Sequence, residues 1–150
     1  MVDRLKVDER FSIEMGPPTA ERVGEFAREG FRSVVNLRAP AEQNQLLSPS
    51  EEGEVARSHG LVYVNIPVSP EDMNEDTAHR FEQEVSRLPG PVVVHCASGK
   101  RAGLFTFMHV ARSEGLSGDA AIAKAESVGF EFASPEAKAF FRRYVNSAQS

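Results

Sequence analysis

The stretch VVVHCASGKRAG, residues 92–103, decides the fold and holds the candidate chemistry. Its first three residues are β-branched, which is typical of a strand covered on both faces. Small residues dominate the next segment, and a helical pattern begins at Ala102. We therefore expect a buried strand at 92–94, a six-residue loop at 96–101 and a helix after it. In open α/β sheets, a loop of this kind lies at the edge where ligands bind.

Outside this stretch, strand-like and helix-like patterns alternate along the chain. Ser48, Pro49 and Glu51 have the spacing of a capping box at one helix start. Strands that alternate with helices predict a parallel sheet with helices on both faces. The predicted fold is an α/β domain with a four-stranded, mainly parallel sheet, formed by residues 1–150 as a single domain. The expected elements are strands at 31–37, 61–66 and 92–94 with an edge strand near 11–14, and helices at 19–28, 48–59, 76–88, 102–113, 117–128 and from 134 onward.

The composition excludes several functions. The 150 residues are 41% hydrophobic and 26% charged, which is typical of one globular domain. The net charge of -5 disfavours binding to nucleic acid or to an anionic membrane surface. The single cysteine excludes an intrachain disulfide, and the four histidines lack the spacing of a metal pair. With neither a membrane-length apolar run nor a signal-peptide pattern, a cytoplasmic protein without a cofactor is expected.

Cys96 lies where its sulfur can become a nucleophile. Backbone amides of a tight loop and of the following helix start can bind a tetrahedral oxyanion and stabilise a thiolate. A buried, inert cysteine is the alternative interpretation. The strand end, the glycine three residues on and the basic pair after it favour a reactive sulfur. The candidate oxyanion-binding residues are Ala97, Ser98, Gly99, Lys100, Arg101 and Ala102.

The segment His95-Cys96-x-x-Gly99 resembles the signature loop of cysteine-dependent tyrosine and dual-specificity phosphatases. The whole chain more closely resembles a bacterial phosphatase-like family whose domain is fused in some proteins to a beta-lactamase-like hydrolase. The resemblance implies a compact dual-specificity-phosphatase fold. The matching segments lie at 10–12, 15–19, 30–38 and 63–68 and in the Cys96 loop.

The resemblance also implies a role for each matching residue. Cys96 would attack phosphorus and form a phosphocysteine, while the planar Arg101 guanidinium would hold the phosphate oxygens. An acid on the loop after the strand at 61–66 would protonate the leaving oxygen and later activate water. Asp72 is the first candidate, followed by Glu71 and Asp76, although these carboxylates also fit a helix start.

Two further residues lie near the predicted loop. Arg38 follows a strand at the ligand edge, where it either contributes to the anion site or makes a structural ion pair. His95 precedes Cys96 along the strand, so its ring is expected on the opposite side of the strand from the sulfur. There it would be buried beneath the loop and hydrogen-bonded to the loop backbone. This places His95 behind the site, without contact with substrate.

The loop departs from the phosphatase pattern in length. Those enzymes place arginine six residues after the cysteine and follow it with a hydroxyl, whereas here Arg101 comes five residues after Cys96 and Ala102 follows. A six-residue loop is also similar to that of rhodanese-type sulfurtransferases, and 36–42 resembles a rhodanese segment. A metal-free cysteine phosphatase acting on a phosphorylated protein or small molecule is the leading hypothesis. A persulfide carrier and an anion-binding pseudophosphatase are the alternatives.

Overall fold

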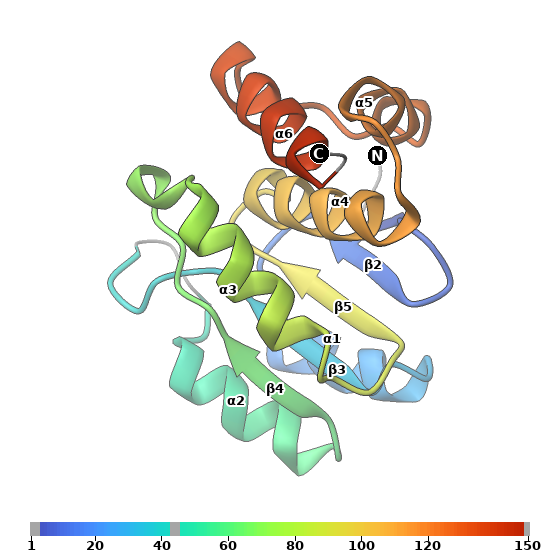
Figure 1. The fold of residues 1–150 in the computed structure, drawn as a ribbon. Coiled ribbons are helices and arrows are strands. Elements are labelled where there is room, and N and C mark those ends of the chain that lie inside the picture. Colours follow the sequence, from blue (N-terminus) through green and yellow to red (C-terminus); the bar gives the residue numbers. More distant parts are fainter. Residues whose placement is uncertain (1–3, 43–45, 149–150) are drawn as a thin grey trace.

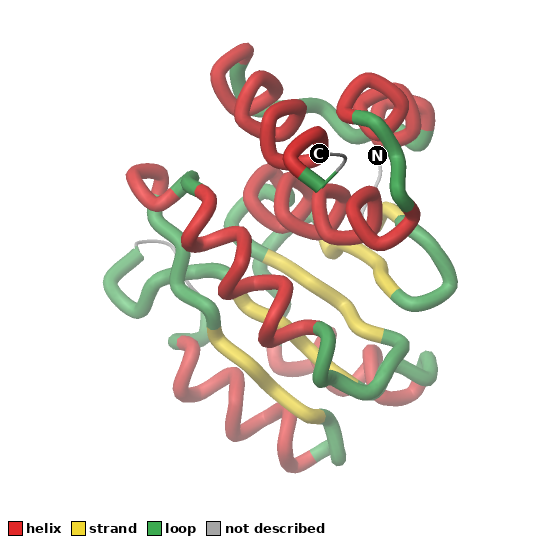
Figure 2. The backbone as a smooth tube through the Cα atoms, viewed as in Figure 1, coloured by secondary structure: helices red, strands yellow, loops and turns green. Residues whose placement is uncertain are grey.

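A central sheet with helices on both faces organises the chain (Figures 1 and 2). The computed structural model describes residues 4–42 and 46–148. Within these ranges no helix combines the length and the apolarity needed to cross a membrane. In chain order the elements are β1 (Arg4–Lys6), β2 (Phe11–Glu14), α1 (Ala20–Arg28), β3 (Ser33–Asn36), α2 (Pro49–Ser58), β4 (Val62–Asn65), the 3-10 turn η1 (Pro70–Asp72), α3 (Glu75–Val85), β5 (Val92–His95), α4 (Lys100–Glu114), α5 (Gly118–Ser127) and α6 (Pro135–Ser147).

The sheet has five strands, in the order β1-β2-β5-β3-β4. The neighbours β2-β5, β5-β3 and β3-β4 are parallel, and β1-β2 is antiparallel. The α/β class and the mainly parallel sheet are confirmed, but the prediction of four strands is wrong. The missed strand is β1, whose three residues are too short to show a period-2 pattern. Its pairing also moves β2, predicted at an edge, into the interior of the sheet.

Alternation along β5 divides the core between the two faces of the sheet. Val93 packs with Val34 and with α1 and α2, whereas Val92 and Val94 belong to the larger cluster formed with α3, α4, α5 and α6. Successive side chains of a strand point to opposite faces. His95 therefore follows Val93 toward α2, and Cys96 continues on the α4 side.

Most helix starts lie where the sequence predicts them. Ser48 caps α2 in a complete capping box with Glu51, and serine side chains also cap α5 and α6. The prediction is wrong for α4, which begins at Lys100 rather than at Ala102. Lys100 and Arg101 therefore belong to its first turn. The strand predicted as buried at 61–66 is the edge strand β4, where Val62 is 42% exposed.

Candidate active site

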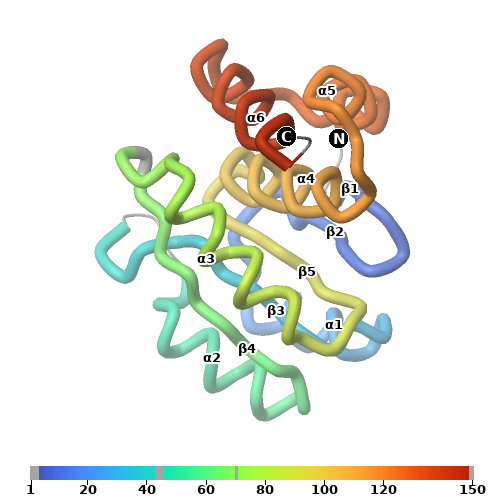
Figure 3. The backbone as a smooth tube through the Cα atoms, in the orientation of Figure 1, coloured from blue at the N-terminus to red at the C-terminus, as the bar shows by residue number. Residues whose placement is uncertain are grey.

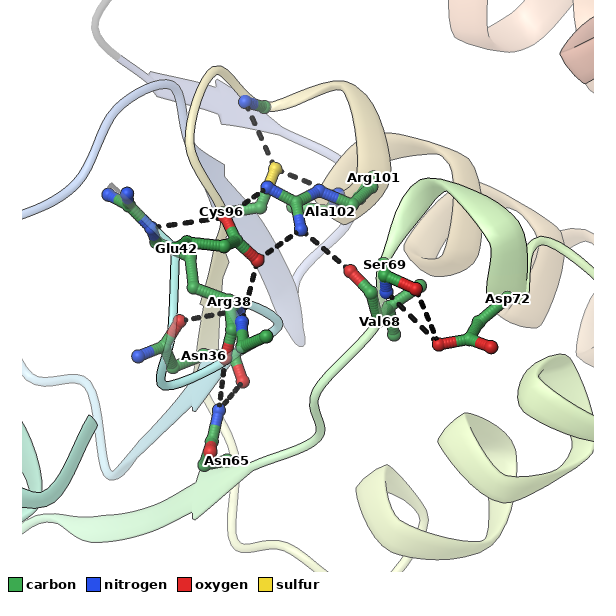
Figure 4. Close-up of polar contacts among 12 residues, drawn as sticks. Asn36, Arg38, Glu42, Asn65, Val68, Ser69, Asp72, Cys96, Arg101 and Ala102 are labelled. Atoms are coloured by element: carbon green, nitrogen blue, oxygen red, sulfur yellow. Dashed lines mark hydrogen bonds and ion pairs between the residues drawn. The ribbon is translucent and has the colours of Figure 1, made fainter. Parts of the chain in front are cut away.

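Cys96 directly follows the central strand β5, and its sulfur accepts two backbone hydrogen bonds. The Gly99 amide donates to Sγ at 3.2 Å and the Ala102 amide at 3.3 Å (Figure 4). Cys96 itself is 1% exposed. Amide dipoles that converge on a sulfur atom stabilise negative charge there, as does the N-terminus of the α4 helix.

Glycine is required at position 99 for two reasons. Gly99 is the N-cap of α4 and has φ +89°, a left-handed conformation that other residues rarely adopt. A Cβ atom there would also lie 2.8 Å from the Met15 side chain. The turn therefore brings the Gly99 amide to the sulfur only because no side chain is present. Ala97 and Ser98, the other residues of the turn, are exposed.

Arg101 is held by both terminal nitrogens of its guanidinium group. Its Nη1 donates to Glu42 Oε2 at 2.7 Å and to the Val68 carbonyl at 2.6 Å, and its Nη2 donates to Glu42 Oε1 at 2.9 Å. A guanidinium group has five N–H donors, so these three bonds leave two others, on Nε and Nη2. The pKa of Arg101 is raised, first by the Glu42 hydrogen bond and also by the Cys96 sulfur.

Glu42, which the sequence did not predict as a site residue, is the carboxylate that holds Arg101. Its Oε2 also accepts a hydrogen bond from the Ala39 amide at 2.6 Å, and its Oε1 lies 3.5 Å from Arg38 Nε. The hydrogen bond from Arg101 holds the pKa of Glu42 below its usual range. The segment 36–42 stood out in the sequence, but nothing there indicated that its glutamate contacts a residue 59 positions later.

Arg38 is placed at the end of β3 by backbone contacts. Its amide donates to Asn36 Oδ1 at 2.9 Å, and its carbonyl accepts from Asn65 Nδ2 at 2.8 Å. The residue is 3% exposed, and its guanidinium faces the Glu42 carboxylate. Of the two predicted roles, the structure contains the ion pair, and Arg38 thereby supports the carboxylate that holds Arg101. Its predicted contact with substrate stays a prediction.

His95 is fully buried, on the opposite side of the sheet from the sulfur. Its Nε2 lies 2.6 Å from Oε2 of Glu52, a buried residue of α2. The predicted hydrogen bond to the loop backbone is wrong, because the alternation that turns the ring away from Cys96 also turns it toward α2. In the part of the chain that the structure describes, His95 Nδ1 has no hydrogen-bond partner.

The structure does not bring Asp72 to the sulfur. Its Oδ2 accepts from the Ser69 hydroxyl at 2.8 Å and from the Ser69 amide at 3.3 Å, so the carboxylate caps η1. Figure 4 shows Asp72 on the far side of Ser69 from Cys96. Glu71 is exposed, and a hydrogen bond with Ser69 lowers its pKa. Asp76 is exposed in the first turn of α3, where a carboxylate favours the helix dipole.

No metal site accompanies these residues within 4–42 and 46–148. No three cysteine, histidine, aspartate or glutamate side chains in these ranges are grouped as metal ligands would be. The positive charge beside Cys96 comes from Arg101, whose side chain is 15% exposed. This guanidinium and the two backbone amides are the groups that the structure places around the sulfur.

Solved structures share the α/β fold in which Cys96 follows the central parallel strand and precedes a helix. P. aeruginosa TpbA has a similar structure, with a TM-score of 0.76 and 18% identity over 99% of this chain and 89% of that one. PTPMT1 is similar with a TM-score of 0.76 and 15% identity, over 97% and 96% of the two chains. These similarities establish the fold.

The family follows from sequence similarity. Residues 7–113 match the family described as "Beta-lactamase hydrolase-like protein, phosphatase-like domain". The beta-lactamase hydrolase-like protein of Xylella fastidiosa is 36% identical over 98 residues, and that of Agrobacterium fabrum is 31% identical. The chain belongs to this phosphatase-like family, so the predicted resemblance is confirmed. The match covers 65% of this chain but only 22% of these curated relatives.

Proposed function

We propose that the protein is a cysteine-dependent phosphomonoester hydrolase that uses the Cys96 thiolate as its nucleophile. The observation that carries the proposal is the convergence of the Gly99 and Ala102 amides on Sγ, at 3.2 and 3.3 Å. Arg101 adds a fixed positive charge beside the sulfur. Membership of a phosphatase-like family supports the same reaction class.

The reaction has two steps. A substrate phosphate binds to the amides of residues 97–102 and to the two remaining N–H donors of Arg101. The Cys96 sulfur attacks phosphorus, so the S–P bond forms while the bond to the leaving oxygen breaks. A water oxygen then attacks phosphorus and gives its proton to the carboxylate that protonated the leaving oxygen, and the S–P bond breaks to release phosphate. The sulfur leaves as a thiolate, which restores the enzyme.

Asp72 is proposed as the acid that protonates the leaving oxygen. To reach a substrate at Cys96, its carboxylate must exchange its hydrogen bonds with Ser69 for one with the substrate. Apo structures often hold catalytic groups in arrangements that change once substrate binds. An ester whose leaving group departs without protonation avoids this requirement, which makes p-nitrophenyl phosphate a suitable first substrate.

The proposed substrate class is a phosphomonoester, either on a protein or on a small molecule. TpbA of P. aeruginosa, a structural relative, has been solved in complex with pTyr. The positive charge of Arg101 and the loop amides suit a phosphate dianion in the same position. The residues around this loop determine which leaving group the protein accepts.

Sulfur transfer is the second candidate, and the position of Asp72 favours it. A Cys96 persulfide needs no general acid, and Asp72 is bound to Ser69 rather than directed at the sulfur. A six-residue loop also forms a smaller cradle for the bound group. Release of thiocyanate from thiosulfate and cyanide would identify this activity.

The test is hydrolysis of p-nitrophenyl phosphate in the presence of a chelator. We expect turnover by the wild type, none by Cys96→Ser, and strongly reduced turnover by Arg101→Lys. A lysine ammonium is a point charge and cannot make the paired, coplanar hydrogen bonds of a guanidinium group. Arg32→Lys is the matched control, since Arg32 is exposed and lies outside the site. A wild type without turnover refutes the hydrolase, and thiocyanate release would replace it with the sulfurtransferase.

A further inference from the structure

A cavity of about 690 Å³ opens beside Arg101, lined by residues of α4, of α6 and of the segment that follows η1. Figure 3 traces the backbone of these elements. Its charged lining residues are Glu42, Lys100, Arg101, Glu136 and Arg143. The rest of the lining is mostly apolar, with Met73 after η1, Leu104 on α4 and a group of residues from the C-terminal region. That group comprises Phe130, Phe132, Ala137 and Phe140. Cavities of this volume, lined mostly by apolar side chains with a few polar groups among them, are typical of small-molecule sites.

The cavity is larger than one aromatic side chain needs. A buried cavity of roughly 150 Å³ accommodates a benzene ring, and the cavity beside Arg101 has more than four times that volume. A ligand anchored at Arg101 through a single phenyl ring would leave most of the apolar wall uncovered. The volume therefore fits a longer apolar group.

The apolar wall is held in place relative to the loop. Lys100 Nζ donates to the Glu131 carbonyl at 2.7 Å, which joins the first turn of α4 to the segment between α5 and α6. In that segment Phe132 makes edge contacts with Phe130 and Phe141, each with ring centroids 5.0 Å apart. The apolar wall is thus a packed part of the fold. It is hydrogen-bonded to Lys100, the residue next to Arg101.

Much of this wall lies outside the part of the chain that defines the family. The family match ends at residue 113, whereas Phe132, Ala137 and Phe140 come after it. The oxyanion cradle, from Cys96 to Ala102, lies inside the match. The cavity therefore combines a cradle that the family model covers with apolar residues that it does not.

We propose that this cavity binds the leaving group of the substrate, and that the substrate is a phosphomonoester whose apolar group is larger than one aromatic ring. The phosphate lies at Cys96 and Arg101, and the apolar group extends between Leu104 and Phe132. The inference rests on the proposed hydrolase, because it places the phosphate on the Cys96 loop. It adds the chemical class of the group to which that phosphate is attached.

Calorimetry with non-hydrolysed ligands tests the inference separately from turnover. Vanadate probes the Cys96 loop alone, and alkylphosphonates from ethyl to octyl probe the loop together with the cavity. Each methylene that leaves water inside the cavity is expected to tighten binding about fourfold. The phosphonate affinity should therefore rise steadily with chain length. The vanadate affinity measures the contribution of the loop alone.

Two variants locate the effect. Ala137→Phe fills the cavity and should weaken octylphosphonate binding about tenfold or more, with vanadate affinity unchanged. Ala123→Phe is the matched control, because Ala123 is exposed on α5 and does not line the cavity. A second variant, Phe132→Ala, should also flatten the dependence on chain length.

The outcomes separate the two proposals. If vanadate binds but affinity does not rise with chain length, or rises equally in Ala137→Phe, the leaving-group cavity is overturned and the hydrolase stands. If vanadate fails to bind, the oxyanion cradle and the hydrolase fail. The inference fails with them, even if long phosphonates bind, because their phosphonate group would then lie outside the loop.

Discussion

The substitution Glu42→Gln tests how the protein orients its arginine. Glu42 accepts hydrogen bonds from Nη1 and Nη2 of Arg101, at 2.7 and 2.9 Å, and Val68 accepts a third. A glutamine side chain has one oxygen and one amide nitrogen, so it can accept only one of the two bonds and carries no charge. The hydrogen bond from Nη1 to the Val68 carbonyl would remain. The paired hydrogen bonds from Nη1 and Nη2 to residue 42 would be reduced to one.

The size of the effect follows from burial. The Glu42 and Arg101 side chains are 23% and 15% exposed, so the pair is screened more than a fully buried one. One hydrogen bond to a charged group contributes roughly 1.5–3 kcal/mol, and we take about 2 kcal/mol for this mostly buried pair. If that free energy holds the guanidinium against the phosphate, its loss lowers kcat/KM and vanadate affinity about 30-fold.

The pH dependence distinguishes a positioning residue from an acid or base. Arg101 lowers the pKa of Glu42, so the stability contributed by the pair is fully present above the unfolded carboxyl pKa, roughly 4.3. It is lost as the pH falls through the lower folded value. Glu42 is thus ionised throughout the neutral range, and Glu42→Gln should lower the pH profile of kcat/KM without changing its shape.

The assay is p-nitrophenyl phosphate hydrolysis across that range, together with vanadate titration. The matched control is Glu114→Gln, which removes an ion pair of 2.6 Å with Lys124 at the far end of α4. This control should retain both activity and vanadate affinity. If Glu42→Gln does the same, or if it shifts a limb of the pH profile, the positioning role assigned to Glu42 is refuted.

Three further predictions concern the acid, the turn and the buried pair. Asp72→Asn should slow hydrolysis of phenyl phosphate about 100-fold or more while leaving p-nitrophenyl phosphate nearly unchanged; equal effects on both esters in steady-state assays would exclude Asp72 as the acid. Gly99→Ala should weaken vanadate binding and destabilise the fold by about 1–2 kcal/mol, because its φ is +89°; unchanged urea denaturation and vanadate titration would contradict this. Glu52→Ala should reduce the free energy of unfolding by about 3 kcal/mol, because it leaves buried His95 without its partner. The exposed neighbour variant Glu54→Ala should cost less than about 1 kcal/mol in the same urea titration, and similar losses in the two variants would contradict the pairing.

Local signals made most of the fold predictable. The capping box at Ser48 and Glu51 is satisfied by atoms three residues apart, so its chemistry is complete in the sequence. The Val92–His95 strand is buried from end to end, which its β-branched residues indicate. In contrast, β1 contributes only three residues, and its place at the sheet edge depends on pairing with β2. Pairing between strands is not encoded in either strand alone.

In the candidate site, too, the sequence predicts the local contacts but not the distant ones. The contacts of Cys96 with Gly99 and Ala102 span three and six residues, and the loop composition predicts them. The contact between Arg101 and Glu42 spans 59 residues and depends on β3 and β5 being parallel neighbours. That register brings the segment after β3 to the Cys96 loop. A sequence pattern can indicate that both segments reach the same edge, but it cannot pair one carboxylate with one guanidinium.

This distant contact orients Arg101 despite its short spacing from Cys96. Both Arg101 and Ala102 lie in the first turn of α4, where adjacent positions differ by about 100° around the helix axis. The Ala102 amide is directed at the sulfur, whereas the Arg101 side chain leaves the helix in another direction and meets Glu42 and Val68. An arginine placed one residue earlier than in the longer phosphatase loop therefore depends on partners outside the loop for its orientation. It follows that replacing Glu42 should affect oxyanion binding here in proportion to the loss of that orientation, while the sulfur keeps both of its amide donors.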